Sequence, residues 1–355
     1  MAQTAVGRLF RQSTTSSISQ SVLRPSQVRS FGNKAAIPTF TPTAIPKLDQ
    51  ALDRFRQDLF IPLGLPKRQR KSVFKPKYAQ ALEHDPITVK ISENEEFTLT
   101  PKNKHELPSK KDAMEVLHMM VETRDFSNLF PFISGLRMSN YTISTDRWEY
   151  IIRKAARTGN LAAVIECANQ YSRTGLSLGN MNIARRLFYE LHHNASRRHF
   201  QDRTTVNALK LAERAASLME RPEHSVRGDS ANDPKQQPFV IGTLLELSVA
   251  CNVDDTSLTT KVVNYSKALK ANWGLGKFED EYTTPAEKQF RAEENLAIVN
   301  AVRMGNLVSR PNPSLVSLMP RAEALEAVLA EQLKSVKNKQ VLADTVAQQL
   351  MSVKE

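Results

Sequence analysis

The feature that most constrains the fold of this chain is a regular recurrence of apolar residues between residues 109 and 272. Apolar side chains return there at every third or fourth position, which places them on one face of an α-helix. The first segment has a capping serine, Ser109, ahead of an apolar stripe at Met114, Leu117 and Val121. The region therefore predicts a succession of amphipathic helices, over residues 109–122, 126–138, 145–158, 161–173, 180–193, 204–219, 239–251 and 256–272.

Paired helices of this length can form repeats, and one unit with a period of 34 residues is visible at residues 146–179. Its first helix contains Trp148 and Ile151, its turn is Gly159-Asn160-Leu161, and a second glycine, Gly175, closes it. Glycine suits both places because it reaches positive φ at a helix end without a steric penalty. Segments of compatible layout lie before and after this unit, at residues 112–145, 180–219 and 239–272.

This layout resembles the pentatricopeptide repeat, a helical hairpin of the same period. The resemblance covers roughly residues 112–272 and implies an all-α solenoid of helical hairpins, of the pentatricopeptide or tetratricopeptide type. Such a solenoid needs about three units to bury its faces, and this chain has about four candidates. The alternative is an irregular helical domain without true repeats, since any helical hairpin of this size has a similar period.

One departure from the family pattern bears on function. Members that read RNA place a small polar residue near the fifth position of each first helix, where it contacts a base. In this chain the corresponding residues are Val116 and Tyr150, and neither offers the hydrogen-bonding pair that a base-by-base code requires. We therefore expect the repeats to serve as architecture rather than as a sequence-reading surface.

The N-terminus has the composition of an import signal. Residues 1–48 contain no aspartate or glutamate, are rich in serine and threonine, and include Arg8, Arg11, Arg24 and Arg29. A secretory signal would need an unbroken apolar core, which is absent here. The tripeptide Arg29-Ser30-Phe31 resembles the cleavage site of the matrix processing peptidase. We predict a mitochondrial transit peptide over residues 1–31 and a mature protein in the mitochondrial matrix.

The segments on either side of the helical pairs differ in character. Residues 32–108 contain nine prolines, too many for a long helix, so we expect an extended arm. Within it, one short helix is expected over residues 48–59 and a small hairpin over residues 87–100, where apolar and polar residues alternate. The C-terminal part, residues 273–355, is expected to hold a helix over 286–304 and a long helix from Arg321 onward, with Leu325 and Leu329 on its apolar stripe.

Basic residues give the sharpest hint of a partner. The formal net charge is +12, which favours an acidic partner such as nucleic acid. Within the arm, six cations and two aromatic residues occur without an acid, at Lys67, Arg68, Arg70, Lys71, Phe74, Lys75, Lys77 and Tyr78. Such residues can lie along a phosphate backbone, where cations displace counterions and aromatic rings stack on bases. The alternative is a solvated linker.

A second, weaker cluster consists of Arg197 and Arg198. It is joined in the sequence by further basic residues, namely Arg185, Arg186, Arg203, His192, His193 and His199. So many cations would repel a metal ion, so we interpret this cluster as a solvated or phosphate-facing basic surface rather than as a metal site.

No motif for catalysis accompanies these residues. The seven histidines form no metal-ligand spacing, and Cys167 and Cys251 form no CxxC pair. The adjacent acids Glu293 and Glu294 point to different faces of a helix and cannot act as a general acid/base pair. No apolar run approaches the length of a membrane-spanning helix. We expect neither an enzyme, nor a cofactor, nor a small-molecule substrate.

An imported, basic, non-catalytic helical protein suits the gene-expression machinery of the mitochondrial matrix, and the pattern resembles organelle-specific ribosomal proteins of the helical-repeat type. We therefore expect a structural or accessory component of the mitochondrial ribosome, which contacts rRNA through the basic arm and neighbouring ribosomal proteins through the helices. Two alternatives stay open. One is a pentatricopeptide-like factor for mRNA stability or translation, and the other is an assembly factor of a respiratory complex that binds only proteins.

Overall fold

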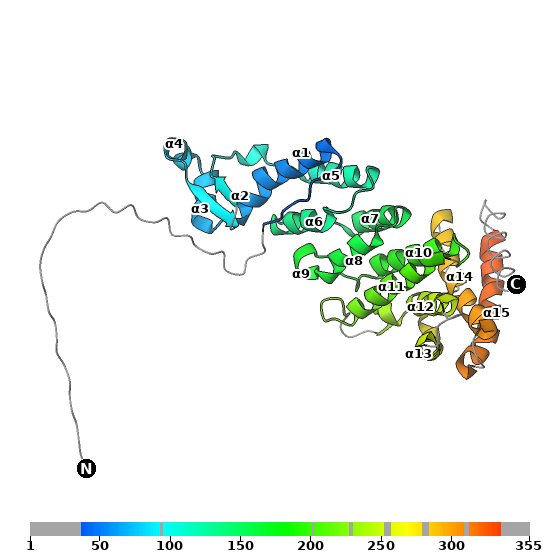
Figure 1. Cartoon of the computed structure of the whole chain (residues 1–355). Coiled ribbons are helices and arrows are strands. Elements are labelled where there is room, and N and C mark those ends of the chain that lie inside the picture. Colours follow the sequence, from blue (N-terminus) through cyan, green and yellow to red (C-terminus); the bar gives the residue numbers. More distant parts are fainter. Residues whose placement is uncertain are drawn as a thin grey trace, which may run out of the picture.

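The computed structural model of the chain describes residues 37–92, 95–200, 202–226, 230–251, 257–278, 284–308 and 312–334. This part is predominantly helical and contains one two-stranded sheet. Its elements follow one another along an elongated body, from the N-terminal helices at one end to α15 at the other (Figure 1). The predicted transit peptide, residues 1–31, lies outside the described residues. No described helix is long and apolar enough to cross a membrane.

The N-terminal unit is helical where the sequence suggested an extended arm. Its helices are α1 (Pro46–Phe55), a π-helical turn η1 (Arg56–Phe60), α2 (Ile61–Gly64), α3 (Lys67–Phe74), a 3₁₀ turn η2 (Pro76–Tyr78) and α4 (Ala79–His84). The extended conformation predicted for this stretch is therefore wrong. The prolines mislead because Pro46, Pro62 and Pro76 stand in the first turns of their elements and Pro66 directly precedes α3, where the missing N–H has no helical partner anyway.

Two smaller predictions for this unit are confirmed. The short helix expected over residues 48–59 is present as α1 and η1. The expected hairpin is present as β1 (Thr88–Ser92) and β2 (Glu95–Thr98), which pair antiparallel with Thr88 opposite Thr98. Arg56 donates two hydrogen bonds to the Glu95 carboxylate, and Lys102 donates one to Asp58 at 2.6 Å. These ion pairs fasten the hairpin and the strand-to-helix connection onto η1.

Aromatic packing joins the N-terminal unit to the helices that follow it. The ring of Phe55 meets that of Phe132 edge to face at 5.2 Å, and Phe60 packs beside both. Phe55 of α1, Phe60 of η1 and Phe132 of α6 are all essentially fully buried. The segment that precedes α1 also takes part, because Asn128 accepts from the backbone N–H of Thr41 at 2.9 Å and donates to its carbonyl at 2.8 Å. The N-terminal unit is thus an integral part of the core.

The predicted helices of the central region are all present, with ends that shift by a few residues. They are α5 (Lys110–Glu122), α6 (Leu129–Met138), α7 (Thr145–Arg157), α8 (Leu161–Asn169) with α9 (Tyr171–Thr174), α10 (Met181–Ser196), α11 (Asp202–Met219), α12 (Pro238–Cys251) and α13 (Ser257–Asn272). Ser109 caps α5 in a capping box with Asp112. Short 3₁₀ turns occupy connections at η3 (Lys104–Glu106), η4 (Ser230–Asn232), η5 (Pro234–Gln236) and η6 (Trp273–Leu275).

Hydrogen bonds between corresponding helices show how neighbouring pairs lie. Asn180, the N-cap of α10, donates to Thr145 at the start of α7, and Asn194 near the end of α10 donates to the carbonyl of Ala156. The first helices α7 and α10 therefore run parallel, side by side. Second helices of neighbouring pairs are also in contact, since Arg173 of α9 donates to Ser134 of α6 at 3.1 Å.

The unit at residues 146–179 is built as its sequence predicts. Trp148 and Ile151 are each 2% exposed, so the aromatic and aliphatic positions of the first helix face the core. Gly159 and Gly175 adopt φ of +77° and +76° at the two turns, where other L-residues would be strained.

The C-terminal helices form a second apolar cluster with α12, which is buried along nearly its whole length. They are α14 (Pro285–Val308) and α15 (Pro313–Lys334), packed against one another. Leu325 and Leu329 are buried as expected, but α15 begins at Pro313 and not at Arg321, so the predicted start is wrong. Pro320 fits inside the helix because it and Val316, one turn earlier, lie on the exposed face, where water can satisfy the carbonyl that lacks an N–H partner.

Candidate nucleic-acid interface

The strongest candidate surface is α3, the helix formed by the basic segment. One apolar residue, Val73, anchors it in a small cluster with Leu65, Leu82 and Leu99, all of which are buried. The backbone is tied as well, because the N–H of Lys102 donates to the carbonyl of Val73 at 2.9 Å. With one side held in this way, the remaining faces of α3 point outward.

The six cations of the segment lie away from the anchored side, with Lys67, Arg68, Arg70 and Lys71 on α3 and Lys75 and Lys77 directly after it. Lys67, Arg68, Arg70, Lys71, Lys75 and Lys77 are exposed, and none of them forms an ion pair within the part of the chain that the structure describes. Arg70 makes one long contact, a 3.5 Å hydrogen bond to the carbonyl of Leu63. The helical conformation brings cations together, because Lys67, Arg70 and Lys71 follow at positions i, i+3 and i+4 and share one face.

The cations stand at a place that is electrostatically unfavourable for the helix. The first turn of α3 contains no acidic residue, and Pro66 offers no side-chain cap. Lys67 and Arg68 therefore lie beside the positive end of the helix dipole without compensation. The same N-terminus presents backbone N–H groups without a capping side chain, so an anionic group brought to this surface would meet both kinds of positive charge.

The two aromatic residues of the segment differ in accessibility. Tyr78 is 38% exposed, and the ammonium group of Lys77 lies 4.7 Å from the centre of its ring. Phe74 is half-buried and packs against the apolar cluster around Val73. Tyr78 is therefore the ring that is better placed to stack on a base, while much of Phe74 serves the packing of α3.

The second predicted cluster is divided by the structure. Arg197 and Arg198 are exposed at the C-terminal end of α10, where a cation is favoured by the helix dipole. The chain then turns sharply, with φ of +51° at His199 and +54° at Phe200. The ring of Phe200 returns to the core and packs 6.2 Å from that of His192. Arg197 and Arg198 thus remain candidates for phosphate contact.

Four other members of that cluster, Arg185, Arg186, His192 and His193, are paired with acids and are not a basic surface, which corrects the interpretation of the sequence for them. The Nε of Arg185 lies 3.8 Å from the carboxylate of Glu294, and Arg186 contacts Glu190 at 3.5 Å. His193 lies 3.5 Å from Glu293 in the same way. Most of these side chains are largely buried between α10 and α14. The acids come from a helix about a hundred residues later or from the buried side of α10 itself, which sequence proximity does not reveal.

The most buried ion pair of the molecule as described joins His192 to Glu246, with 2.6 Å between Nδ1 and a carboxylate oxygen. Burial by itself lowers the pKa of His192, but the charge of Glu246 and its hydrogen bond outweigh burial and raise the pKa above its usual value. Burial raises the pKa of Glu190 and of Glu294 despite the arginines beside them. These charged groups therefore hold helices together and do not face a ligand in solvent.

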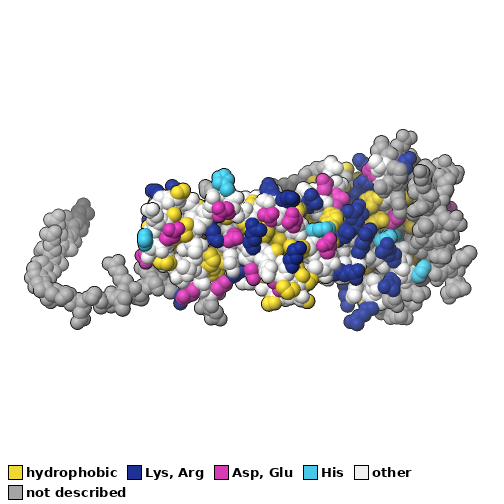
Figure 2. All heavy atoms as spheres, turned by 90° about the horizontal axis from the view of Figure 1, so that it is seen from above, with side chains coloured by type: hydrophobic (Ala, Val, Ile, Leu, Met, Phe, Trp, Pro, Cys, Tyr) yellow, Lys and Arg dark blue, Asp and Glu magenta, His cyan; other side chains and the backbone are white. Residues whose placement is uncertain are grey.

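The structure also reveals a row of cations that we did not single out in the sequence. Arg147, Arg153, Lys154 and Arg157 lie along α7, and all but Lys154 are exposed. None forms an ion pair with another described residue. Their spacing of i, i+6, i+7 and i+10 was the available signal, because it places them on one side of a helix. Figure 2 shows Lys and Arg side chains gathered toward the later helices, whereas acids and bases alternate over the N-terminal half.

Among the described residues, no group of three or more His, Cys, Asp or Glu side chains is arranged to hold a metal ion. Cys167 is buried in α8, and burial raises the pKa of its thiol. The features that point to a partner are therefore the exposed cations.

Two comparisons with known proteins bear on these surfaces. Residues 26–353 match the family model of the mitochondrial ribosomal protein mS27. Over 194 residues the chain is also 25% identical to the small ribosomal subunit protein mS27 of Neurospora crassa, an alignment that covers 54% of this chain and 49% of that protein. The chain spans about half the length of the curated relative that it matches. The family match includes α3, α7 and the end of α10.

Proposed function

The chain belongs to the family of the mitochondrial ribosomal protein mS27, and on this premise we propose that it is a non-catalytic structural component of the mitochondrial small ribosomal subunit. Within that subunit, α3 contacts rRNA, and the paired helices contact neighbouring ribosomal proteins. Arg197 and Arg198 add a second, smaller rRNA contact.

One observation carries the rRNA contact. Six exposed cations lie on α3 or directly after it without an ion-pair partner among the described residues. Two of them, Lys67 and Arg68, stand where the helix dipole disfavours positive charge. The fold gains nothing from this arrangement. A phosphate backbone gains from it, because each cation that meets a phosphate releases condensed counterions.

The paired helices are proposed to form a solenoid of the pentatricopeptide or tetratricopeptide type. Parallel first helices, α7 beside α10, and the glycine turns at Gly159 and Gly175 support this arrangement. A base-reading role is disfavoured, since Val116 is 2% exposed and the hydroxyl of Tyr150 is engaged with His118 at 3.2 Å. The residues that would contact bases in an mRNA-binding factor of this type are therefore not available for that role.

The site of action follows from the family. A mitochondrial ribosomal protein acts in mitochondria, and we propose the matrix as the compartment. Residues 1–31 are proposed to be the transit peptide that directs the chain there, on the strength of an N-terminus without acidic residues.

The test removes four cations of α3 together. In cells, Lys67, Arg68, Arg70 and Lys71 are replaced by Gln, and mitochondrial extracts are sedimented through sucrose gradients with increasing KCl. A matched control replaces four exposed lysines on other helices, namely Lys110, Lys111, Lys267 and Lys270. We expect the α3 variant to leave the small-subunit fractions at lower salt than the wild type and the control variant.

A binding measurement makes the expectation quantitative. With purified protein and small-subunit rRNA, loss of four phosphate contacts should make the slope of log affinity against log salt less negative by about three. An unchanged slope and an unchanged gradient would remove α3 from the rRNA contact. Absence of the wild-type chain from small-subunit fractions would overturn the whole proposal.

A further inference from the structure

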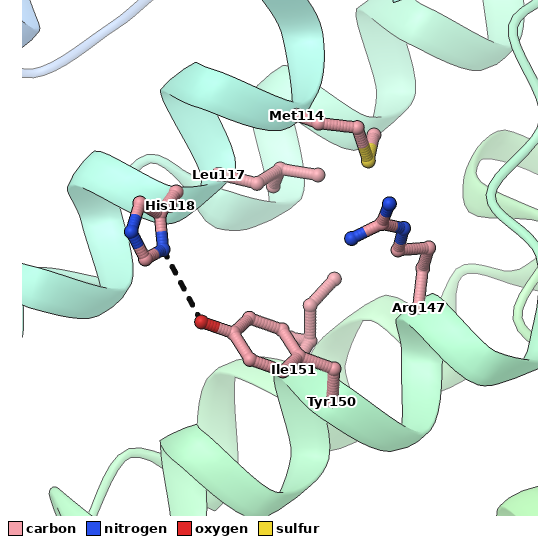
Figure 3. Close-up of a pocket in the computed structure, with 6 residues that line it drawn as sticks. All are labelled: Met114, Leu117, His118, Arg147, Tyr150 and Ile151. Atoms are coloured by element: carbon pink, nitrogen blue, oxygen red, sulfur yellow. Dashed lines mark hydrogen bonds between the residues drawn. The ribbon is translucent and has the colours of Figure 1, made fainter. Parts of the chain in front are cut away.

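A pocket of about 320 Å³ lies between the first helices of two successive pairs. It is lined by Met114, Leu117 and His118 of α5 and by Arg147, Tyr150 and Ile151 of α7. Figure 3 shows side chains from both helices pointing into the space between them, with Met114 and Leu117 reaching from α5 toward Ile151 and Arg147 on α7. This pocket is distant in the sequence from α3 and has no part in the rRNA contact proposed above.

Two polar groups of the wall, on His118 and Tyr150, are bound to one another, and the part of the pocket lined by Met114, Leu117 and Ile151 is apolar. The Nδ1 of His118 and the hydroxyl of Tyr150 are hydrogen-bonded at 3.2 Å, and the Nε2 of His118 lies 2.9 Å from Glu122. The Tyr150 ring is flanked by cations, with Arg153 at 5.9 Å and Lys154 at 5.5 Å from its centre. The imidazole and the hydroxyl that could read a nucleobase are therefore engaged with each other.

The rim of the pocket is positive. The guanidinium group of Arg147 points into the opening (Figure 3), and the row continues along α7 through Lys154 to Arg157. These three cations have no ion-pair partner among the residues that the structure describes. An apolar interior beside an unpaired row of cations matches a partner that presents an apolar side chain next to acidic residues.

We propose that this pocket docks a segment of a neighbouring protein, which inserts one apolar side chain between α5 and α7 and lays acidic residues along α7. The inference rests on the proposed function, because the neighbour is a protein of the assembled small subunit. Met114 suits such a contact, since an unbranched thioether side chain adapts its shape to an inserted group. The apolar anchor supplies binding energy in a desolvated pocket, and the cations fix the register of the acidic segment.

The experiment places a photoreactive group in the pocket. A benzophenone amino acid replaces Met114 in cells, small subunits are purified and irradiated, and the crosslinked products are digested with ribonuclease and protease and identified by mass. The matched control places the same group at Glu115, the next residue along α5, which is exposed and does not line the pocket. A second variant adds Arg147→Gln and Lys154→Gln to the benzophenone at position 114.

We expect a crosslink from position 114, and not from position 115, to a peptide of another protein that has an apolar residue beside acidic ones. The two substitutions on α7 should lower its yield by about three- to tenfold, as expected when interfacial charge pairs are lost. A crosslink to RNA, a crosslink confined to this chain, or a yield that is insensitive to the α7 substitutions would overturn the inference. These failures differ from failure of the proposed function, in which the chain would be missing from the purified subunits.

Discussion

The Nδ1 of His192 lies 2.6 Å from a carboxylate oxygen of Glu246, in the buried interior where α10 meets α12. The second oxygen of the same carboxylate accepts a hydrogen bond from the side-chain amide of Asn300 on α14, at 3.1 Å. One buried carboxylate therefore connects three helices, and it joins the central helical pairs to the C-terminal cluster. Its partners offset the cost of burying the carboxylate, so loss of either partner would leave an uncompensated polar group in the interior.

Removal of one partner of this pair should destabilise the protein more than removal of both. His192→Leu leaves the carboxylate of Glu246 buried without its cation, at an expected cost of about 3–5 kcal/mol. The double variant, His192→Leu with Glu246→Leu, should cost less than either single change, since no charge remains buried. Urea denaturation of the wild type, the two single variants (His192→Leu and Glu246→Leu) and the double variant gives the free energies of unfolding for this double-mutant cycle. Additive losses would contradict a direct interaction of this kind.

The pair also gives stability a pH dependence of defined sign. Because folding raises the pKa of His192, its contribution is present in full below the unfolded pKa of about 6.5 and is lost as the pH rises through the higher folded pKa. Burial lowers the pKa of His224, so the contribution of His224 to stability changes with pH in the opposite sense. Comparing the wild type with a variant that retains His224 cancels this contribution. The difference in free energy of unfolding between wild type and Glu246→Gln should shrink as the pH rises above about 6.5. A difference that stays constant would show that His192 does not change its protonation over the pH range measured, and would contradict the prediction.

The basic residues of α3 should be dispensable for folding. Replacing Lys67, Arg68, Arg70 and Lys71 by Gln removes positive charge from an uncapped helix N-terminus, so the free energy of unfolding should be equal to that of the wild type or slightly higher, within about 0.5 kcal/mol. Thermal denaturation followed by circular dichroism provides the comparison. A clear loss of stability would mean that these cations support the fold, and their exposure could no longer be taken as a sign of a partner.

The junction between the N-terminal unit and α6 should be sensitive to a single methyl group. A Cβ at Gly135 would lie 2.5 Å from the ring of Phe60, which is fully buried, so Gly135→Ala should cost about 1–3 kcal/mol through overpacking. Gly274→Ala is the matched control, because a Cβ there would meet nothing within 4 Å. In the Gly135→Ala background, Phe60→Leu should be less damaging than in the wild type, as urea denaturation would reveal. Equal damage in both backgrounds would argue against the contact.

The mature protein should begin near Gly32. If Arg29 directs the matrix peptidase to the bond after Phe31, N-terminal sequencing of the chain purified from mitochondria will start at or within a few residues of Gly32. Arg29→Ala should shift or slow this processing during import into isolated mitochondria. Recovery of the purified chain with residues 1–31 intact would refute the predicted transit peptide.

Local information in the sequence determined where the helices lie. Apolar spacing, the capping serine Ser109 and the turn glycines Gly159 and Gly175 depend on contacts within a few residues, and the helices they predict are present from α5 to α13. The burial of Trp148 follows from the same periodicity. The cations of α3 could be found in the same way, since a run of charges without acids is visible before any folding.

Tertiary structure decided what the charged residues do. From the sequence, Arg185 and His192 were predicted to belong to a basic surface. In the structure Arg185 pairs with Glu294 and His192 with Glu246, and both acids come from helices far along the chain. The prolines of the first helices likewise led to the prediction of an extended arm. A proline breaks a helix in its interior but not in its first turn, and the sequence alone did not show where each helix begins. Periodicity places a side chain on a face of its own helix, but only packing determines which other helix that face meets, and therefore whether a charge is buried with a partner or left for a ligand.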